Sequence, residues 1–573
     1  MVKEKKHTTG NRRKDIINFV MTISIVILAN FVFSFYFQRF DLTSEKRYTL
    51  AESTRKLLKD LDDVVYMKIY LQGDLNPDFT RLRNETKEIL DEFRAYSNNQ
   101  IDYEFINPGE NPNKEEVNKI EKQLYDKGII PEQVIDKSKK GQKVTETLLW
   151  PGALVTYRGR ELPWQIYKKQ AGGGFSAEMS INNSVQELEY GITNTIRKLQ
   201  APRKPEVTFI EGHSELDTLR QYDFMRSLSE YYEVNRTVIN QKLDALNGTD
   251  VIVISQPDSA FVEKDKFIID QFIMRGGKVL WMIDPVYLDM DTFRLKQFTL
   301  GFNNDLNLTD MLFRYGVRLN PVLVQDMQCA KIPVNVGFKN GQPNFQPFQW
   351  LYSPLLMPDI DHPIVKNLDL IKMEFAGTID TITAKGIKKT ILLHTSRYTK
   401  LQPTPARVAL AMVQFKPKES QFSTPYQPVA CLLEGEFESN YKNRANQSMH
   451  DSVLEAFKYK EISKKTKMIV IADGDIAKND VMRRTGPLPL GYDQFTNQTF
   501  ANKTFLLNCV NYLLDDEGLL QLRAREIKLR LLAKKKIEGK ESKWQLINIA
   551  LPLGIVILFG LIQFYIRKRK YAS

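Results

Sequence analysis

Two long apolar runs, one near each end of the chain, constrain its fold more than any other feature. They are Ile16–Phe37 and Trp544–Ile566, and neither contains a charged residue. About 20 apolar residues are enough to cross the hydrocarbon core of a bilayer, whereas a helix in a soluble core is rarely apolar on every face. We therefore predict two transmembrane helices, over residues 16–38 and 544–566.

The first run lacks the features of a cleaved signal peptide. Such a peptide has an apolar region of about 7–15 residues, followed by small residues at the cleavage site. Here the run is longer and ends in Phe35, Tyr36 and Phe37, followed by Gln38 and Arg39. The sequence predicts an uncleaved anchor.

Basic residues next to the spans predict their orientation, because cytoplasmic flanks carry an excess of Lys and Arg. The residues before the first span are Lys3, Lys5, Lys6, Arg12, Arg13 and Lys14. We expect a two-pass protein of the cytoplasmic (inner) membrane, with basic cytoplasmic tails over 1–15 and 567–573 and a periplasmic block between the spans. Basic residues at 534–543 oppose this orientation, and we let the first span decide it.

The formal net charge of +12 is typical of proteins that bind nucleic acid. The two tails and residues 515–543 account for about +11 of it, however. Basic residues beside a membrane span indicate topology and contact with lipid headgroups. We therefore predict the lipid bilayer as a partner and no nucleic acid.

The block between the spans is long enough for two or three domains. The breaker stretch Ala201–Pro205 divides it into a first domain over 39–200 and a second over 201–515. A basic amphipathic helix is predicted over 516–543, next to the membrane. The predicted class is α/β.

The first domain is predicted to be a small α/β unit similar to thioredoxin. Val64–Leu71 and Ile101–Ile106 have strand patterns, and Phe79–Ser97 has the apolar spacing of a helix. A redox-active thioredoxin has Cys-x-x-Cys after its first strand, but this chain has Gln72–Leu75 there, which excludes thiol chemistry. A hairpin, a flexible loop and a helix complete the domain, at Glu146–Ile166, Lys168–Glu178 and Ile181–Leu199.

The second domain has the pattern of a parallel sheet buried on both faces, in which apolar strands alternate with helices. Strands are predicted at Val207–Ile210, Glu233–Val238, Asp250–Ser255, Lys278–Ile283 and Lys467–Ala472. Helices are predicted at Leu219–Tyr232, Val262–Arg275 and Asn502–Leu514. Residues 300–460 interrupt the pattern as an elaboration with some strands, such as Lys389–Thr395 and Val429–Glu434.

The chain has three cysteines, too few for a disulfide scaffold. Cys509 lies in an apolar stretch and is predicted to be a buried free thiol. A disulfide between Cys329 and Cys431 stays open at this point.

Ligands of parallel sheets bind at the carboxyl ends of the strands, where several polar residues follow the predicted strands. This candidate ligand or partner surface consists of Glu211, His213, Glu215, Gln256, Asp284, Asp473 and Asp475. The turn around His213, with its carboxylates and Asp217, could hold a metal ion, but a single His in such a turn is more often solvated. Asp473–Gly474–Asp475 could bind a cation or a sugar, and a tight turn is the simpler interpretation.

Two catalytic motifs are incomplete. Gly212–Ser214 resembles the start of a nucleophile elbow, but Leu216 replaces its second Gly and no helix follows at once. Gly276–Lys278 lacks the loop of the Gly-x-x-x-x-Gly-Lys-Ser/Thr motif and precedes a strand rather than a helix. We predict no catalytic residue, no cofactor and no metal, and no ATP hydrolysis by a phosphate-binding loop.

Several stretches, in this order, resemble the GldG family of gliding-motility proteins of Bacteroidota, which are auxiliary components of an ABC-type assembly. The stretches are Arg47–Leu61, Val65–Phe93, Glu206–Leu216, Asp250–Pro257, Arg275–Pro285, Met468–Asp475 and Asn502–Glu526. The resemblance implies an accessory subunit that works with a membrane permease (GldF-like) and a cytoplasmic ATPase (GldA-like).

The resemblance also implies a second domain similar to class I glutamine amidotransferases. Those enzymes place a catalytic Cys at the turn after a central strand. The corresponding turns here are Gln256–Pro257, Asp284–Pro285 and Asp473–Gly474, none of which contains Cys. The residues and the resemblance therefore agree on a non-catalytic scaffold.

Three functions are carried forward. The leading hypothesis is a non-enzymatic accessory subunit of a transporter-like complex, whose periplasmic domains bind partners or a ligand while a separate ATPase supplies energy. The first alternative is a membrane-tethered hydrolase of cell-wall or glycan substrates that uses Glu211, His213 or Asp473. The second is a tethered solute-binding protein, which needs a cleft of more than about 300 Å³ between its domains.

Overall fold

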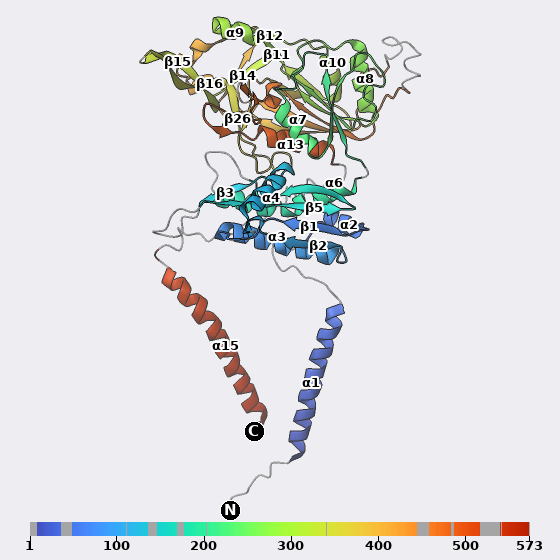
Figure 1. Cartoon of the computed structure of the whole chain (residues 1–573), viewed down its shortest axis with the longest axis vertical. Helices are drawn as coiled ribbons and strands as arrows, with labels where there is room; N and C mark the ends of the chain where they lie inside the picture. Colours follow the sequence, from blue (N-terminus) through green and yellow to red (C-terminus); the bar gives the residue numbers. More distant parts are fainter. Residues whose placement is uncertain are drawn as a thin grey trace, which may run out of the picture. The chain divides into compact units, whose positions relative to one another are not determined.

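The computed structural model shows a mixed α/β protein (Figure 1), which confirms the predicted class. It describes residues 9–35, 49–110, 112–135, 146–168, 177–201, 203–339, 341–443, 458–482, 486–515, 539 and 541–571. The chain forms two compact units, Met1–Glu526 and Ile527–Ser573. Much of the predicted loop Lys168–Glu178 and of the predicted helix over 516–543 lies outside the described residues.

A four-stranded sheet with the order β2-β1-β5-β6 forms the centre of the part before residue 201. Its strands are β1 (Val65–Ile69), β2 (Ile101–Phe105), β5 (Gly152–Tyr157) and β6 (Arg160–Gln165). β1 and β2 are parallel because helix α3 crosses between them, whereas β5 and β6 form an antiparallel hairpin. The other described elements are α2 (Glu52–Lys59), α3 (Pro77–Tyr96), the 3₁₀ turn η1 (Pro108–Glu110), α4 (Lys114–Asp126), β3 (Glu132–Ile135), β4 (Glu146–Leu149), α5 (Ala177–Gln186) and α6 (Leu188–Gln200).

Local sequence accounts for the ends of these elements. Asn76 caps α3, because its side-chain oxygen accepts the N–H of Phe79 at 2.9 Å, and Pro77 occupies the first helical position. The β5–β6 turn needs two residues with positive φ, and Arg158 and Gly159 have φ of 49° and 74°. The predicted strand–helix–strand unit is therefore confirmed, and the hairpin is confirmed over β5 and β6. The first part of its predicted arm, Glu146–Leu149, instead forms β4 and pairs with β3 in a separate sheet, while similarity to thioredoxin stays a prediction.

The predicted helix Ile181–Leu199 is two helices, α5 and α6. The break is at Glu187, whose backbone N–H donates to the carbonyls of both Asn183 and Ser184, at 3.1 and 3.2 Å. Such shared bonding tightens a helical turn. Periodicity does not reveal the break, because apolar residues continue at helical spacing through it.

A seven-stranded sheet with the order β19-β22-β23-β10-β9-β7-β8 forms the centre of the second part. Its strands are β7 (Glu206–Glu211), β8 (Glu233–Val238), β9 (Val251–Ser255), β10 (Lys278–Met282), β19 (Ile387–His394), β22 (Pro428–Gly435) and β23 (Thr466–Ile471). Five of them are parallel, as predicted, but β22 and β19 are antiparallel to their neighbours. The predicted parallel sheet is thus confirmed over five strands, whereas the assignment of Lys389–Thr395 and Val429–Glu434 to an elaboration was wrong, because they extend this sheet at one edge.

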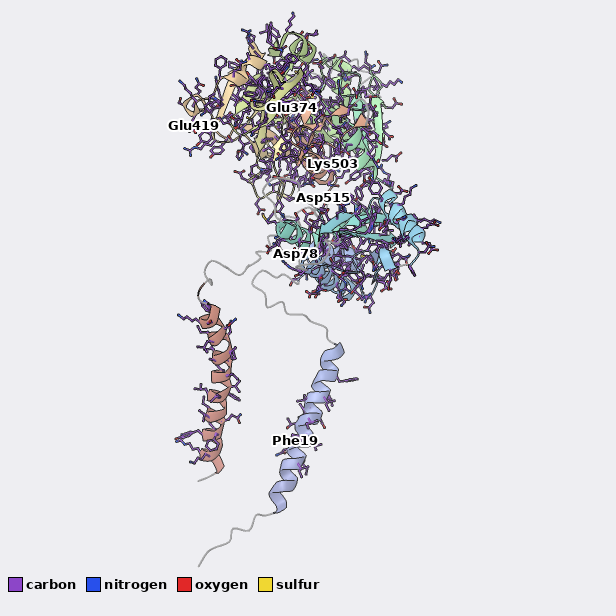
Figure 2. The ribbon with its side chains drawn as sticks, turned by 60° about the vertical axis from the view of Figure 1, so that its left-hand side comes forward. Phe19, Asp78, Glu374, Glu419, Lys503 and Asp515 are labelled. Atoms are coloured by element: carbon purple, nitrogen blue, oxygen red, sulfur yellow. The ribbon has the colours of Figure 1, made fainter. Side chains whose placement is uncertain are left out.

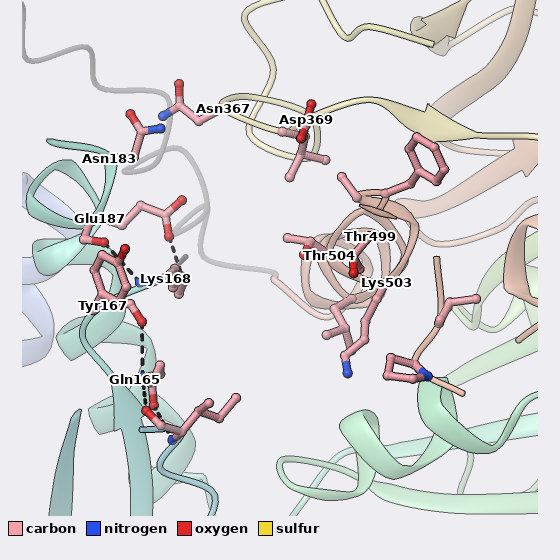
Figure 3. Close-up of a pocket in the computed structure, with 18 of the residues that line it drawn as sticks. Gln165, Tyr167, Lys168, Asn183, Glu187, Asn367, Asp369, Thr499, Lys503 and Thr504 are labelled. Carbon is pink, nitrogen blue, oxygen red and sulfur yellow. Dashed lines mark hydrogen bonds and ion pairs between the residues drawn. The ribbon is translucent and has the colours of Figure 1, made fainter. Parts of the chain in front are cut away.

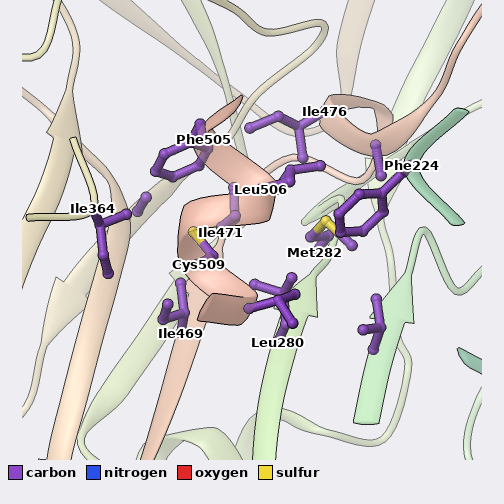
Figure 4. Close-up of a cluster of buried hydrophobic side chains, with 14 of the residues drawn as sticks. Phe224, Leu280, Met282, Ile364, Ile469, Ile471, Ile476, Phe505, Leu506 and Cys509 are labelled. Carbon is purple, nitrogen blue, oxygen red and sulfur yellow. The ribbon is translucent and has the colours of Figure 1, made fainter. Parts of the chain in front are cut away.

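Residues that alternate along the central strands supply two separate cores. Leu280 and Met282 of β10 lie in the core under α7 (Tyr222–Ser229) and α13 (Asn502–Leu513). Val279 and Trp281 lie in the opposite core, under α8 (Glu263–Met274). Figure 4 shows the first core, where Phe505, Leu506 and Cys509 of α13 pack on the sheet. The predicted helix Leu219–Tyr232 is shorter than expected, since α7 begins at Tyr222 and ends at Ser229.

The remaining elements of the second part are short, apart from one hairpin formed by β15 and β16. The remaining helices of the second part are α9 (Met290–Lys296), α10 (Thr309–Tyr315) and the 3₁₀ turns η2 (Leu410–Gln414), η3 (Glu419–Gln421) and η4 (Asp475–Ala477). Its strands are β11 (Val286–Leu288), β12 (Phe298–Asn303), β13 (Val317–Asn320), β14 (Val322–Asp326), β15 (Cys329–Lys339), β16 (Gln342–Leu356), β17 (Ile371–Lys372), β18 (Thr378–Thr381), β20 (Thr399–Pro403), β21 (Ala406–Ala409), β24 (Val481–Met482), β25 (Gly486–Pro487), β26 (Tyr492–Asp493) and β27 (Gln498–Thr499).

The three cysteines are free thiols. Cys509 and Cys431 are buried, which confirms the prediction for Cys509. The disulfide between Cys329 and Cys431 does not form.

Two apolar helices, α1 (Thr9–Phe35) and α15 (Glu541–Tyr571), occupy the positions of the predicted spans. Among the described residues, one helical segment is long and apolar enough to cross a membrane, Ser542–Ile566, with a mean hydropathy of 2.3 and no buried residue. The described apolar segment of α1 is shorter, Ile16–Leu28, and its side chains are exposed, Phe19 by 66% (Figure 2). The first span therefore stays a prediction.

Truncation of Phe505 tests the contribution of α13 to the core. Phe505→Ala should lower the free energy of unfolding by about 3–5 kcal/mol, because it leaves a cavity where the side chain is fully buried. Thermal unfolding in detergent measures the effect, and labelling of Cys509 with a thiol reagent should accelerate. Phe415→Ala is the matched control, since that side chain is 75% exposed and its loss should change little. Equal effects of both substitutions would contradict the packing of α13.

Candidate functional site

The loops that follow β10 and β23 bring three aspartates together at the carboxyl end of the seven-stranded sheet. Oxygens of Asp284, Asp473 and Asp475 lie within 4.8 Å of one another. β10 and β23 are neighbouring parallel strands, so the residues that follow them share one edge of the sheet. The structure therefore assembles three of the seven predicted surface residues into one aspartate cluster.

Both oxygens of Asp284 accept hydrogen bonds from the neighbouring loops. One accepts the backbone N–H of Gly474 at 2.6 Å, and the other accepts the side-chain amide of Gln256 at 2.8 Å. Position 474 has no room for a side chain, because a Cβ there would lie 2.7 Å from the Cβ of Gln256. Burial, and then repulsion by Asp475, raise the pKa of Asp284 to about 7.

Asp473 and Asp475 have different partners. Asp473 is fully buried and accepts the N–H groups of Glu374 and Ile476, at 2.8 and 3.0 Å. Burial and the charges of the other two aspartates raise its pKa well above its usual value. Asp475 accepts from the ammonium of Lys478 at 2.5 Å. Burial alone would lower the pKa of Lys478, but Asp475 and Glu374 raise it.

This arrangement can hold protons or a cation. Three carboxylates could bind a divalent ion, although Ca²⁺ takes about 6–8 oxygen ligands. Five of the six carboxylate oxygens, both in Asp284, both in Asp473 and one in Asp475, already accept hydrogen bonds from the chain itself. The raised pKa values of Asp284 and Asp473 favour their protonated forms, and the hydrogen bonds that Asp284 accepts from Gln256 and Gly474 link the loops after β9, β10 and β23.

His213 belongs to a separate and closed group. Its ring stacks on Phe261 at 3.7 Å between centroids, and its two nitrogens lie 3.2 Å from Glu215 and 3.5 Å from Asp265. The side chain is 6% exposed, and its backbone carbonyl accepts the N–H groups of Asp258 and Ser259. His213 is therefore a structural residue that joins the loops after β7 and β9.

The other predicted members of the His213 turn are apart from it. Glu211 forms an ion pair with Arg236 of β8. Asp217 is exposed beside Arg220. Ser214 contacts the hydroxyl of Ser259 at 2.9 Å and has no imidazole partner among its described hydrogen bonds. Among the described residues, neither the metal site considered for the His213 turn nor a nucleophile–base pair with Ser214 is assembled here.

Sequence reasoning missed Glu374 and Lys478. Glu374 contributes its backbone N–H to Asp473 and its carboxylate to Lys372 at 2.9 Å, from a segment about a hundred positions earlier in the chain. It lies within the stretch 300–460, where no periodic pattern could place it. Lys478 could have been found, because it is three residues after Asp475, one turn away.

A cleft of about 470 Å³ separates the first part of the chain from the second (Figure 3). On one side lie Gln165, Tyr167, Lys168, Asn183 and Glu187. On the other lie Asn367, Asp369, Thr499, Lys503 and Thr504. Apolar residues, among them Leu368, Leu490 and Leu507, complete the lining. The cleft exceeds the size that the solute-binding alternative requires.

The raised pKa of Asp284 predicts a pH effect. The pKa of Asp284 is about 7 in the folded protein and about 3.9 in an unfolded chain. Its contribution to the free energy of unfolding is therefore fully present at low pH and is lost as the pH rises through about 7. Asp284→Asn imitates the protonated acid, and Gln256 can turn its amide to accept the new N–H. The variant should unfold at a higher temperature than wild type at pH 8, by about 2–4 °C or more, and the difference should vanish near pH 4.

Asp361→Asn is the control, because that side chain is 74% exposed. It should leave the dependence of melting temperature on pH unchanged. Addition of Mg²⁺ or Ca²⁺ distinguishes a cluster that holds protons from one that binds a metal ion. If either ion raised the melting temperature of wild type but not of Asp284→Asn, a proton-holding cluster would be contradicted.

Comparisons with known proteins found a full-length relative, a domain match and a solved structure with a similar segment. An uncharacterized protein of Borreliella burgdorferi is 22% identical over 572 residues, which cover 98% of this chain and 99% of that protein. Residues 44–156 match a domain of unknown function. A solved structure, the mmIFT52 N-terminal domain, covers 55% of this chain and 98% of its own, at 13% identity and a TM-score of 0.31, which is too low to support an argument.

The match to a transport family covers the whole seven-stranded sheet. Residues 204–509 match the family described as an ABC-type uncharacterized transport system, and they make up more than half of the chain. Family membership indicates association with components of a transport system. The protein belongs to the auxiliary components of this ABC-type transport family.

Proposed function

We propose that the protein is a non-enzymatic, membrane-anchored subunit of an ABC-type transport complex. Its partners are a permease-type membrane subunit (GldF-like) and a cytoplasmic ATPase (GldA-like) that supplies the energy. Both ends anchor it in the inner membrane, with its termini in the cytoplasm and its α/β domains, one thioredoxin-like and one amidotransferase-like, in the periplasm. The helix Ser542–Ile566 and the transport family support this arrangement.

The closed carboxyl edge of the seven-stranded sheet carries the proposal. Enzymes with such sheets keep their reacting groups there, open to substrate. In this chain the polar groups at that edge bind one another: His213 binds Glu215, Glu211 binds Arg236, and Gln256 binds Asp284. The aspartate cluster is likewise bonded to backbone N–H groups and to Lys478.

The described thiols do not offer a nucleophile. Burial raises the pKa of Cys431 to about 12, and burial followed by the charge of Asp326 raises that of Cys329 to about 12. Burial raises the pKa of Cys509 well above its usual value. A thiol with such a pKa has almost no thiolate at neutral pH, and thiolate is the reactive form.

Purification of the tagged protein after mild solubilisation tests the proposal. It should recover a polytopic permease and a nucleotide-binding subunit, and a chain that lacks residues 544–573 should recover neither. Recovery of the protein alone would refute the proposal. A phenotype test addresses the finer role in gliding motility, since loss of the gene should abolish surface movement in a gliding host.

Two conservative substitutions separate a scaffold from a hydrolase. Glu211→Gln and Asp473→Asn remove two of the carboxylates that the hydrolase alternative uses, with little change in side-chain volume. Both variants should support normal function of the complex. A loss of more than about a hundredfold, the usual effect of removing a catalytic acid or base, would favour the hydrolase.

The cleft supports a second function, the binding of a small solute. Its volume of about 470 Å³ lies within the usual range for ligand pockets, and it combines apolar walls with a few amides and charges. Native mass spectrometry of the protein from membranes should then detect a retained small molecule. Thr504→Trp, which fills the cleft from α13, should abolish retention, and Thr496→Trp, an exposed control, should not. Retention by both variants would exclude the cleft as the site.

A further inference from the structure

A second, smaller pocket lies where α6 ends and the seven-stranded sheet begins. Its volume is about 230 Å³. The residues that line it are Arg160, Leu162, Arg197, Lys198, Ala201, Lys204, Pro205, Tyr231, Tyr232 and Leu514. Four of these are basic and none is acidic, which distinguishes this basic junction pocket from the cleft.

Arg160 and Arg197 are held in place by hydrogen bonds and an ion pair with the chain itself. One guanidinium nitrogen of Arg160 donates to the carbonyls of Leu199 and Ala201, at 3.1 and 2.6 Å. Arg197 forms an ion pair with Asp515 at 2.9 Å, and this partner neutralises its charge. The position of Arg160 is therefore fixed before any ligand arrives, and its charge has no carboxylate partner among the described residues.

Lys198 has aromatic rings and no carboxylate as partners in the described structure. Its ammonium lies 3.8 Å from the ring centroid of Tyr231 and 5.2 Å from that of Tyr232. Burial, followed by repulsion from Arg197 and Lys168, lowers the pKa of Lys198 to about 7, and Glu230 acts weakly in the opposite direction. No acidic residue lines the pocket beside Lys198, and Glu230, outside that lining, is the carboxylate that acts on its charge.

A structural role accounts for only part of this arrangement. Basic residues in the last turn of a helix interact favourably with its dipole, and Arg197 and Lys198 occupy that turn of α6. A cation–π contact adds up to about 2 kcal/mol when it is desolvated. Neither effect explains why Arg160, Lys198 and Lys204 line one hollow without a counter-charge.

We propose that the basic junction pocket binds a phosphate group, with Lys198 as its central ligand and Arg160 and Lys204 beside it. Guanidinium and ammonium groups form charge-assisted hydrogen bonds with phosphate oxygens. The pocket is large enough for a phosphate with a small substituent. The group belongs either to a soluble phosphate compound or to the headgroup of a phospholipid.

Calorimetric titration of the full chain in neutral detergent tests the site, with inorganic phosphate as the probe. Wild type should bind, and Lys198→Met should bind at least about tenfold more weakly, because a hydrogen bond to a charged group is lost while the stem still packs on the tyrosines. Lys87→Met removes the same charge from an exposed lysine on α3 and should bind as wild type does. Lys204→Met, at an exposed position, should weaken binding even if Lys198→Met folds poorly.

Sulfate, whose charge is constant near neutrality, supplies a second readout. Its affinity should fall as pH rises from about 6 to 8, since only the ammonium form of Lys198 binds an anion. The groups that face Lys198 are Arg197, Lys168, Glu230 and the two tyrosines. Lys198→Met should abolish this pH dependence and Lys87→Met should keep it.

Nanodiscs distinguish the two sources of phosphate. If a lipid headgroup is the ligand, phosphatidylglycerol discs should suppress phosphate binding by wild type, and discs of neutral glycolipid should not. If the ligand is a soluble phosphate compound, wild type should bind phosphate in both kinds of disc. Absence of phosphate and sulfate binding in detergent and in glycolipid discs, or equal binding by wild type and both pocket variants, would overturn the proposal.

Discussion

The alternation of side chains along β10 and β23 is the constraint on which the second part of the chain depends. Leu280 and Ile469 face α13, while Trp281 and Val470 face α8. A shift of one residue in either strand would exchange the two faces, and both helices would lose their packing. The same register fixes where the two strands end. It thereby brings Asp284 and Asp473 to one edge, where the aspartate cluster forms.

The parts of the fold that depend on local periodicity could be predicted. The strand Val251–Ser255 was predicted correctly because a strand buried on both faces is a continuous apolar run. The helix Asn502–Leu513 was predicted correctly because its buried residues recur at helical spacing. The strands β19 and β22 were also found, but not their place in the main sheet. Strand pairing joins residues far apart, such as Cys431 and Val470, and nothing local specifies the partner.

The candidate site shows the same division. The turns after β7, β9, β10 and β23 were recognised from their position after apolar strands. The sequence did not predict which of these turn residues contact one another, because that depends on the geometry of the loops. Asp284 accepts a hydrogen bond from Gly474, whereas the ring of His213 stacks on Phe261. Glu374 reaches Asp473 from a segment without a recognisable pattern. The result is an edge whose polar groups hold loops together. Under the functions proposed above, recognition falls to the surfaces of the cleft and of the basic junction pocket instead of this edge.

The end of α13 shows how such surfaces are linked. Lys467 of β23 donates to the carbonyl of Asp515 at 2.7 Å, and the carboxylate of Asp515 binds Arg197 of α6 (Figure 2 shows Asp515). The side chain of Asp515 is 1% exposed, and loss of one partner of a buried pair leaves an uncompensated charge. α13 also lines the cleft through Lys503 and Thr504. α13 and the residues directly after it therefore contact the sheet core, the cleft and α6, so an event that displaces α6 must either move this segment or break the Arg197–Asp515 pair.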